Sequence, residues 1–342
     1  MISRILIVGL GSIGKRHLRL ARELKPDADI RILRHGIATK NHDYSDGYFF
    51  NIKDAINFLP HVAVIANPAT HHVPIAQKLA EKGVHLLIEK PLSVSLKGID
   101  NLIATCKRKN AVLSVGYNLR YLKSLQYFKS LIDKGVAGKI FSVRCEAGQY
   151  LPTWRPGEDY RAGVSANKEL GGGVLLELSH ELDYLRWIFG EIEWVTASLS
   201  HQSNLKINVE DTAHLLLGFV TKPNKAQLIG AVNLDFIRHD SVRKCVAIGE
   251  KASLMWDGIS FEVKILNKSK NQWKKLLKET PHKDESYLLE WKNFLLSIKN
   301  SKSPKITGKD GQKILQIINA ARKSAKTNKK VYVIGSNLKN SL

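Results

Sequence analysis

The chain opens with a short apolar segment, a glycine-rich turn and a helical pattern, and this combination limits its fold more than any other feature. Residues 5–8 form an apolar run typical of a strand covered on both faces of a parallel sheet. Gly9, Gly11 and Gly14 follow, and a helix is expected from Ser12 to Leu24. In a dinucleotide-binding turn, the first glycine permits the tight bend, the second lets the backbone approach a pyrophosphate, and the third lets helix and strand pack closely. We therefore expect phosphates at the amino end of this helix.

The choice between the two nicotinamide dinucleotides depends on the end of the second strand. About 20 residues after the turn, the fingerprint expects a carboxylate that binds the ribose 2′-hydroxyl. Arg34 stands there instead. A guanidinium suits a 2′-phosphate, which a carboxylate would repel. The residues therefore favour NADP(H), with Lys40 as a second phosphate ligand. NAD(H) stays the alternative, because Arg34 stacked on the adenine would suit both cofactors.

The first 120 residues alternate between strands and helices. Further strands are expected at 30–33, 62–66, 84–88 and 111–115. One helix is expected from His71 to Lys82, with Thr70 as its N-cap and Gly83 as its C-cap, and another from Ser95 to Lys109. This alternation predicts an α/β fold with a doubly wound parallel sheet over residues 1–120.

The pattern changes after about Tyr121, where long strands follow one another without helices between them. We expect strands at 139–150, 192–200, 211–220, 227–236, 242–248, 254–256 and 330–334. Helices are expected at 121–133, 285–299 and 310–326, and at 174–189 directly after the glycine run 171–173. Residues 121–342 are thus predicted to form an α+β domain with a large, mostly antiparallel sheet.

Composition excludes several classes of protein. The 342 residues suffice for roughly two domains, and a hydrophobic content of 44% argues against extensive disorder. The three cysteines are too few and too widely spaced for a disulfide scaffold or a zinc site, so we expect no metal. The apolar runs are shorter than the ~18 residues that a membrane span needs. We expect a soluble, cytoplasmic protein with no membrane association.

The net charge of +22 raises the question of an anionic partner. The basic residues are spread along the chain, and no nucleic-acid-binding module is visible. The residues therefore argue against a nucleic-acid partner. An anionic cofactor or substrate explains part of the charge, and solvated lysine-rich surfaces explain most of the rest.

Polar motifs follow the predicted strands and one later helix. Asn67-Pro68 ends the strand at 62–66, Glu89-Lys90-Pro91 the next strand, and Gly116-Tyr117-Asn118 the last strand of the first domain. In the second half, the glycine run leads into residues 174–183, which contain His180 and Asp183. Together with the glycine turn, these motifs resemble the Gfo/Idh/MocA oxidoreductases, which include glucose–fructose oxidoreductase and inositol dehydrogenase.

The resemblance implies an NAD(P)-dependent dehydrogenase that transfers a hydride between nicotinamide C4 and a hydroxyl or keto carbon of a sugar, sugar acid or nucleotide sugar. It implies Lys90 and His180 as catalytic residues and often a cis Lys-Pro peptide. A histidine has a pKa suited to removing a hydroxyl proton. Many sugar dehydrogenases of the family carry an aspartate four residues before the histidine, where this chain has Leu176. Glu177 is the nearest carboxylate, and on one helix face it would serve as a third catalytic residue.

The resemblance and the strand ends also indicate the binding residues. Cofactor contacts are expected from Gly9, Gly11, Ser12, Ile13, Gly14, Arg34, Asn67, Pro68, Thr70, His71, Glu89, Lys90 and Asn118. Substrate contacts are expected from Lys90, Tyr117, Arg120, Trp154, Arg155, His180 and Asp183. Asp183 has two further interpretations, as a residue that orients His180 or as part of an ion pair on the helix face. The resemblance also implies a homodimer or homotetramer formed through the second domain.

Two other functions stay open at this point. One is a regulator on the same fold that senses cofactor or sugar without turnover, although such a protein would need neither Lys90 nor His180. The other is a related reductase that acts on a non-sugar substrate. One fold hosts many functions, so the fold cannot decide between them.

Overall fold

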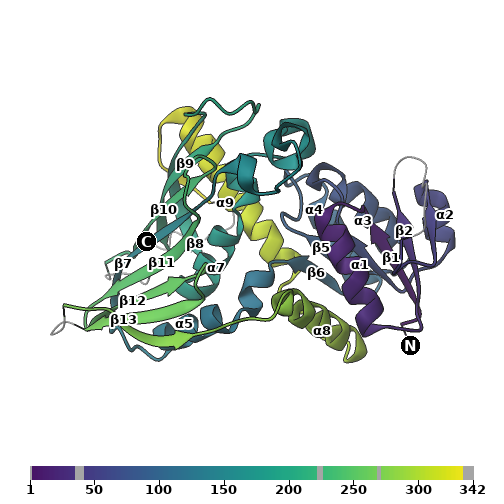
Figure 1. The fold of residues 1–342 in the computed structure, drawn as a ribbon, viewed down its shortest axis with the longest axis horizontal. Coiled ribbons are helices and arrows are strands. Elements are labelled where there is room, and N and C mark those ends of the chain that lie inside the picture. The colour runs from purple at the N-terminus through teal and green to yellow at the C-terminus, as the bar shows by residue number, and fades with distance from the viewer. Residues whose placement is uncertain (1, 35–41, 222–225, 268–270, 334–342) are drawn as a thin grey trace, which may run out of the picture. The chain divides into compact units, whose positions relative to one another are not determined.

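The computed structural model describes residues 2–34, 42–221, 226–267 and 271–333. The chain divides into two compact units. The first contains Met1–Tyr117 and Tyr287–Leu315, and the second contains Asn118–Ser286 and Gln316–Leu342. Each unit is built around one sheet (Figure 1).

The first unit contains the predicted doubly wound sheet. Its six strands lie in the order β3-β2-β1-β4-β5-β6, and every neighbouring pair is parallel. The strands are β1 (Arg4–Val8), β2 (Asp29–Leu33), β3 (Gly47–Phe49), β4 (Val62–Ile65), β5 (His85–Glu89) and β6 (Leu113–Gly116). The helices are α1 (Ser12–Leu24), α2 (Ile52–Asn57), α3 (His72–Ala80), α4 (Ile99–Arg108), α8 (Glu285–Lys299) and the start of α9 (Gly308–Thr327). The strand order reverses between β1 and β4, and ligands bind at such a switch point in open α/β sheets.

Two predicted helix starts in this unit were wrong. Thr70 does not cap α3, because a 3-10 turn at Ala69–His71 precedes that helix and His71 occupies the N-cap position. Ser95 does not open α4, which begins after Gly98 in a left-handed conformation (φ +78°). The short elements β3 and α2 were not predicted. The three residues of β3 are only half-buried, and the six residues of α2 are too few to establish a helical pattern.

The chain returns to the first unit near its C-terminus, which the expected boundary at residue 120 did not foresee. In α8, the fully buried Trp291 and Phe294 belong to the same hydrophobic cluster as Ile5 and Leu18. Each such aromatic side chain contributes about 1.5–3 kcal/mol through burial. Further along, the Ile306 carbonyl accepts hydrogen bonds from Ser114 Oγ (3.1 Å) and the Val115 N–H (3.3 Å), beside edge strand β6. Residues 287–315 therefore complete the first unit.

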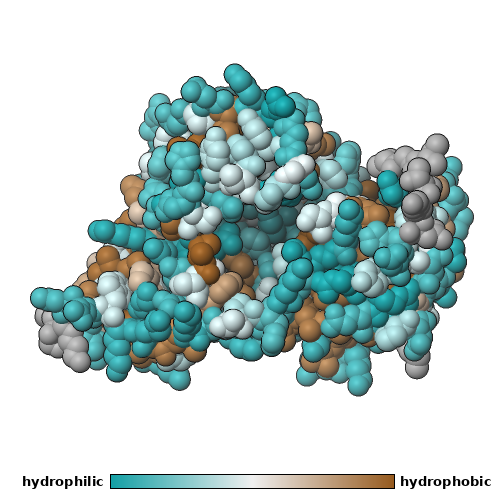
Figure 2. All heavy atoms as spheres, viewed as in Figure 1, coloured by the Kyte–Doolittle hydropathy of each residue, from teal (hydrophilic) through white to brown (hydrophobic). Residues whose placement is uncertain are grey.

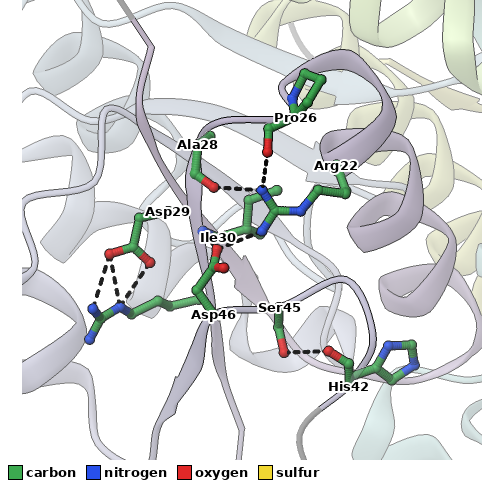
Figure 3. Close-up of polar contacts among 9 residues, drawn as sticks. Arg22, Pro26, Ala28, Asp29, Ile30, His42, Ser45 and Asp46 are labelled. Atoms are coloured by element: carbon green, nitrogen blue, oxygen red, sulfur yellow. Dashed lines mark hydrogen bonds and ion pairs between the residues drawn. The ribbon is translucent and has the colours of Figure 1, made fainter.

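A polar cluster anchors the chain that leads into β3 (Figure 3). From α1, the Arg22 guanidinium donates to the carbonyls of Pro26 and Ala28, each at 2.7 Å, and to the Asp46 carboxylate at 2.5 Å. The same carboxylate accepts the Ile30 backbone N–H at 2.7 Å. One side chain thus ties the end of α1, the start of β2 and the approach to β3 together.

The second unit is built on a nine-stranded sheet in the order β14-β13-β12-β11-β7-β10-β9-β8-β15. Its strands are β7 (Ile140–Gly148), β8 (Ile192–Ser200), β9 (Thr212–Phe219), β10 (Ile229–Asp235), β11 (Val242–Gly249), β12 (Ala252–Asp257), β13 (Glu262–Asn267), β14 (Lys274–Lys278) and β15 (Val331–Tyr332). Within this nine-stranded sheet, β7–β10 is the only parallel pair among the described strands, so the predicted mostly antiparallel sheet is confirmed. The strands β13 and β14 were not predicted.

Helices α5 (Lys123–Asp133) and α7 (His180–Phe189) lie along one face of this sheet (Figure 1). The single helix predicted over 174–189 is wrong. The chain forms a short helix α6 (Val174–Glu177), leaves helical geometry at Leu178, and begins α7 at His180. The glycine run makes this entry possible, because Gly173 has φ +107° and a Cβ on Gly172 would lie 2.3 Å from the Val164 carbonyl oxygen.

Hydrophilic residues cover most of the face drawn in Figure 2, and smaller apolar patches interrupt them. Among the described residues, no helix combines the length and the apolar character that crossing a membrane requires.

Candidate functional site

The glycine turn after β1 has the geometry that a bound pyrophosphate requires. Gly9 has φ +89°, and a Cβ there would lie 2.8 Å from the Asn67 backbone. A Cβ on Gly14 would lie 2.2 Å from the Gly9 carbonyl oxygen, so helix and turn touch at this glycine. Around Gly11, by contrast, no described atom beyond its two chain neighbours lies within 4 Å of the Cβ position. The two tight glycines shape the turn, while the backbone at Gly11 stays open to a ligand.

The amino end of α1 presents unbonded N–H groups to the same space. Gly11 is the N-cap, and the described residues supply no side-chain cap and no acidic residue in the first turn. The first helical hydrogen bond runs from Lys15 N–H to the Gly11 carbonyl at 2.9 Å. The N–H groups of Ser12, Ile13 and Gly14 therefore precede the helical ladder, where an anion is favoured.

The neighbouring strand β4 contributes buried polar atoms at the switch point. Asn67 Oδ1 and Thr70 Oγ1 are buried and find no hydrogen-bond partner among the described residues. Burying such atoms without a partner costs free energy, which a polar ligand would offset. Pro68 precedes the 3-10 turn, and His71 in that turn is exposed. These residues fit a dinucleotide that crosses from the glycine turn toward β4.

Sequence reasoning missed His72, which connects the ends of two strands. Its buried ring lies 2.7 Å from the Asn67 carbonyl through Nε2 and 3.1 Å from the Pro91 carbonyl through Nδ1. Burial lowers the pKa of His72, so the neutral ring can donate to one of the two carbonyls. The only signal in the sequence was a second histidine at a helix start.

The Glu-Lys-Pro motif ends β5, and its glutamate holds the following backbone. Glu89 Oε2 accepts the Lys90 backbone N–H at 3.1 Å, and the Lys90–Pro91 peptide is cis, as the resemblance implied. Glu89 Oε1 lies 2.7 Å from His17 Nε2. On the other side of the ring, Trp291 Nε1 donates to His17 Nδ1 at 2.9 Å. Residues from α1, β5 and α8 thus meet directly behind Lys90.

A second carboxyl group lies in this interior cluster. Oxygens of Glu89 and Glu290 and a nitrogen of His17 all lie within 4.8 Å of one another, and all three residues are buried. Two ionised carboxylates at that separation would repel each other by about 3 kcal/mol at an effective dielectric constant of ~20. Burial and the neighbouring Glu89 charge raise the pKa of Glu290 well above its usual value. Sequence reasoning missed Glu290, since it lies about 200 residues from the motif.

Arg34 is partly exposed just after β2, and its backbone N–H donates to the Phe49 carbonyl at 3.1 Å. The structure therefore places it beside β3, beyond the carboxyl end of the second strand. Lys40 lies outside the described residues.

In the second unit, His180 is the first residue of α7 and is almost fully buried. Asp183, one turn later, accepts two hydrogen bonds from Arg120, at 2.8 Å from Nε and 2.6 Å from a terminal nitrogen. Both side chains of this ion pair are buried. Asp183 thus belongs to an ion pair, but its partner lies outside its own helix and not on the expected helix face.

The helix argument for Glu177 is wrong. Glu177 ends α6, and the chain leaves helical geometry before His180, so the two residues do not share one helix face. The carboxylate nearest to position 176 therefore has no regular helical spacing from His180.

The remaining predicted residues are divided between the two units. Tyr117 is fully buried in the first unit. Asn118 is buried in the second unit, where its side-chain amide donates to Ser286 Oγ at 2.8 Å. Trp154 packs edge-on against Phe236, with ring centres 5.1 Å apart. It lines a hollow with the exposed Arg155.

Comparison with known protein families gives a match in each half of the chain. Residues 3–117 match the NAD-binding Rossmann-fold domain of the GFO/IDH/MocA oxidoreductases, and residues 125–255 match the C-terminal domain of the same family. The chain belongs to the Gfo/Idh/MocA family. It is therefore an oxidoreductase with a nicotinamide dinucleotide as its cofactor.

Relatives within the Gfo/Idh/MocA family span nearly the whole chain. Myo-inositol 2-dehydrogenase of Thermotoga maritima is 24% identical over 96% of this chain and 98% of its own length. Levoglucosan dehydrogenase in complex with NADH has the same fold, with a TM-score of 0.83 at 22% identity over 97% of this chain and 99% of that one. WlbA of Bordetella pertussis, in complex with NADH and UDP-GlcNAcA, gives a TM-score of 0.78 at 21% identity, with 97% and 99% covered.

Proposed function

We propose that the chain transfers a hydride to or from a CH–OH carbon of a sugar, sugar acid or nucleotide sugar, with NADP(H) as the favoured cofactor. The observation that carries this proposal is the position of Lys90. It directly follows β5, the strand beside β4, whose end contributes the unpartnered oxygens of Asn67 and Thr70. The family relatives that act on inositol and levoglucosan, and the complex with UDP-GlcNAcA, support the sugar class.

Each end of the cofactor has candidate ligands in this chain. The turn at Gly9, Gly11 and Gly14 would hold the pyrophosphate, and Asn67 and Thr70 would contact the dinucleotide beyond it. When bound, the dinucleotide supplies a hydride donor or acceptor at the nicotinamide ring. Glu89 accepts the Lys90 backbone N–H and thereby fixes the position of the Lys90 Cα, from which the side chain extends.

Residues of the protein carry out the proton transfer. Oxidation of an alcohol removes a hydroxyl proton, and we assign His180 as the base that accepts it. Lys90 would donate a hydrogen bond to the reacting oxygen. The Arg120–Asp183 ion pair holds the first turn of α7 and thereby His180. Glu177, Tyr117, Trp154 and Arg155 stay candidates for relaying the proton or contacting the substrate.

The cofactor preference is tested by titrating the protein with NADPH and NADH separately and following nicotinamide fluorescence. We expect tighter binding of NADPH, and we expect Arg34→Asp to weaken NADPH binding about tenfold or more, because it replaces a charge-assisted contact with repulsion. Lys107→Asp makes the same change of charge on an exposed position of α4 and should leave the preference intact. Equal binding or a preference for NADH would refute the role of Arg34 but not the oxidoreductase assignment.

The reaction is tested by screening sugars, sugar acids and nucleotide sugars with both oxidised cofactors. His180→Asn should lower kcat by about 10²–10⁴-fold, as expected for a lost general base, and should leave cofactor binding largely intact. A wild-type protein that binds cofactor but turns over none of these classes would contradict the sugar assignment.

A further inference from the structure

Nothing in the described part of the chain donates a hydrogen bond to the interior carboxyl group of Glu290. It lies on α8 and is fully buried, and neither of its oxygens is hydrogen-bonded among the described residues. A carboxylate in that position would be an uncompensated buried charge, which proteins avoid. The carboxyl group must therefore be neutralised by a neighbour or by a proton.

His17 cannot supply the neutralising charge. The indole N–H of Trp291 can only donate, and it donates to His17 Nδ1 at 2.9 Å. Nδ1 must therefore carry a lone pair, and the ring proton sits on Nε2, from which it is donated to Glu89 Oε1 at 2.7 Å. The ring is thus neutral, and its Nε2 has no lone pair to offer a metal ion. The close spacing of His17, Glu89 and Glu290 is better explained by protons than by a cation.

The two carboxyl groups differ in the donors that they receive. Glu89 accepts hydrogen bonds from His17 Nε2 and from the Lys90 backbone N–H, and such bonds favour the ionised form. Glu290 receives none among the described residues. The single negative charge of the pair therefore belongs on Glu89.

We propose that Glu290 is a neutral carboxylic acid and a positioning residue for the cofactor side of the site. By holding a proton, it leaves Glu89 as the only carboxylate in the cluster, free to hold the backbone of Lys90. The positioning role rests on the proposed function, because it affects activity through the part that Lys90 takes in the reaction. The protonation state of Glu290 does not depend on that function.

The groups around Glu290 determine how the cluster responds to pH. They are Glu89 on β5, His17 and Arg16 on α1, and Tyr287 on α8 itself, where the Arg16 guanidinium lies 4.7 Å from the ring centre. Raising the pH ionises Glu290 and places a second negative charge beside Glu89. Because the pKa of Glu290 is raised in the folded state, its contribution to stability is complete below the ordinary glutamate pKa and is lost as the pH rises through the folded value.

Two measurements that need no substrate test the protonation state. An infrared difference spectrum between wild type and Glu290→Gln at neutral pH should contain the carbonyl band of a protonated carboxyl group. The Tm of Glu290→Gln should rise relative to wild type as the pH increases, because glutamine does not ionise. Lys292→Gln, an exposed position on the same helix, should show neither effect.

Activity tests the positioning role. Glu290→Ala should lower kcat at least about tenfold by loosening the support behind Lys90, and Glu290→Gln should restore most of that loss while weakening the alkaline decline of the pH profile.

A missing protonated-carboxyl band, or a Gln variant as impaired as the Ala variant, would overturn the proposal. If the Ala variant does not fold, the spectrum and the Gln pH profile still decide. If wild type turns over no sugar, the proposed function fails, and the infrared band alone supports or refutes the neutral acid.

Discussion

At the scale of single residues, the three glycines of the first turn have different physical roles. Gly14 is required by contact, because any side chain there meets the Gly9 carbonyl oxygen at 2.2 Å. Gly11 has open space around its Cβ position. A side chain at Gly11 would therefore affect a ligand rather than the fold. This difference allows folding and cofactor binding to be separated by two alanine substitutions.

We expect Gly14→Ala to destabilise the protein by about 1–3 kcal/mol, as overpacking of a tight contact does. Gly11→Ala should change stability by less than about 1 kcal/mol, which is the scale of glycine backbone effects. Cofactor binding should weaken in both variants. Thermal unfolding without cofactor and fluorescence titration with NADPH give the two readouts. Unimpaired binding in Gly11→Ala would contradict the approach of the pyrophosphate at that residue.

At the scale of secondary-structure elements, α8 adds residues to the site that the sequence motifs did not indicate. It is far from the glycine turn in sequence, yet Trp291 and Phe294 pack in the core beneath that turn. The same helix brings Trp291 to His17 and Glu290 to Glu89. A helix that appeared to belong to the second domain is therefore part of the nucleotide-binding unit.

Phe294→Ala should cost about 3–5 kcal/mol of stability, because it leaves a cavity among fully buried side chains. The unit that loses stability should be the one that binds cofactor, so added NADPH should raise the Tm of the variant. Leu296→Ala is the matched control on the same helix: Leu296 is 54% exposed, so its loss should cost less than about 0.5 kcal/mol. Equal effects of the two substitutions would argue that α8 does not contribute to this core.

At the scale of the whole molecule, each unit carries part of the proposed chemistry. The first unit holds the glycine turn, Arg34 and Lys90, and the second holds His180 and the Arg120–Asp183 ion pair. The net charge of +22 acts at this scale as well. Its general effect is to attract anions, which suits a dinucleotide cofactor and, at low ionic strength, speeds its association.

The sequence by itself determined the parts of this protein that depend on local pattern. Apolar strand runs, the glycine spacing and the strand–helix alternation predicted the parallel sheet and the nicotinamide cofactor, because these features follow from backbone geometry and burial within a few residues. The long strands after residue 139 predicted the second sheet in the same way. The motifs at the strand ends then identified the Gfo/Idh/MocA family, which both domain matches confirm.

Only the tertiary structure decided which distant residues meet. The break between α6 and α7 at Leu178 lies inside a segment whose sequence pattern predicts one continuous helix, so no local pattern reveals it. The ion pair of Asp183 with Arg120 joins residues 63 positions apart, and Trp291 reaches His17 across 274 positions. Whether a buried carboxyl such as Glu290 holds a proton depends on its neighbours in space, because desolvation and nearby charge set its pKa.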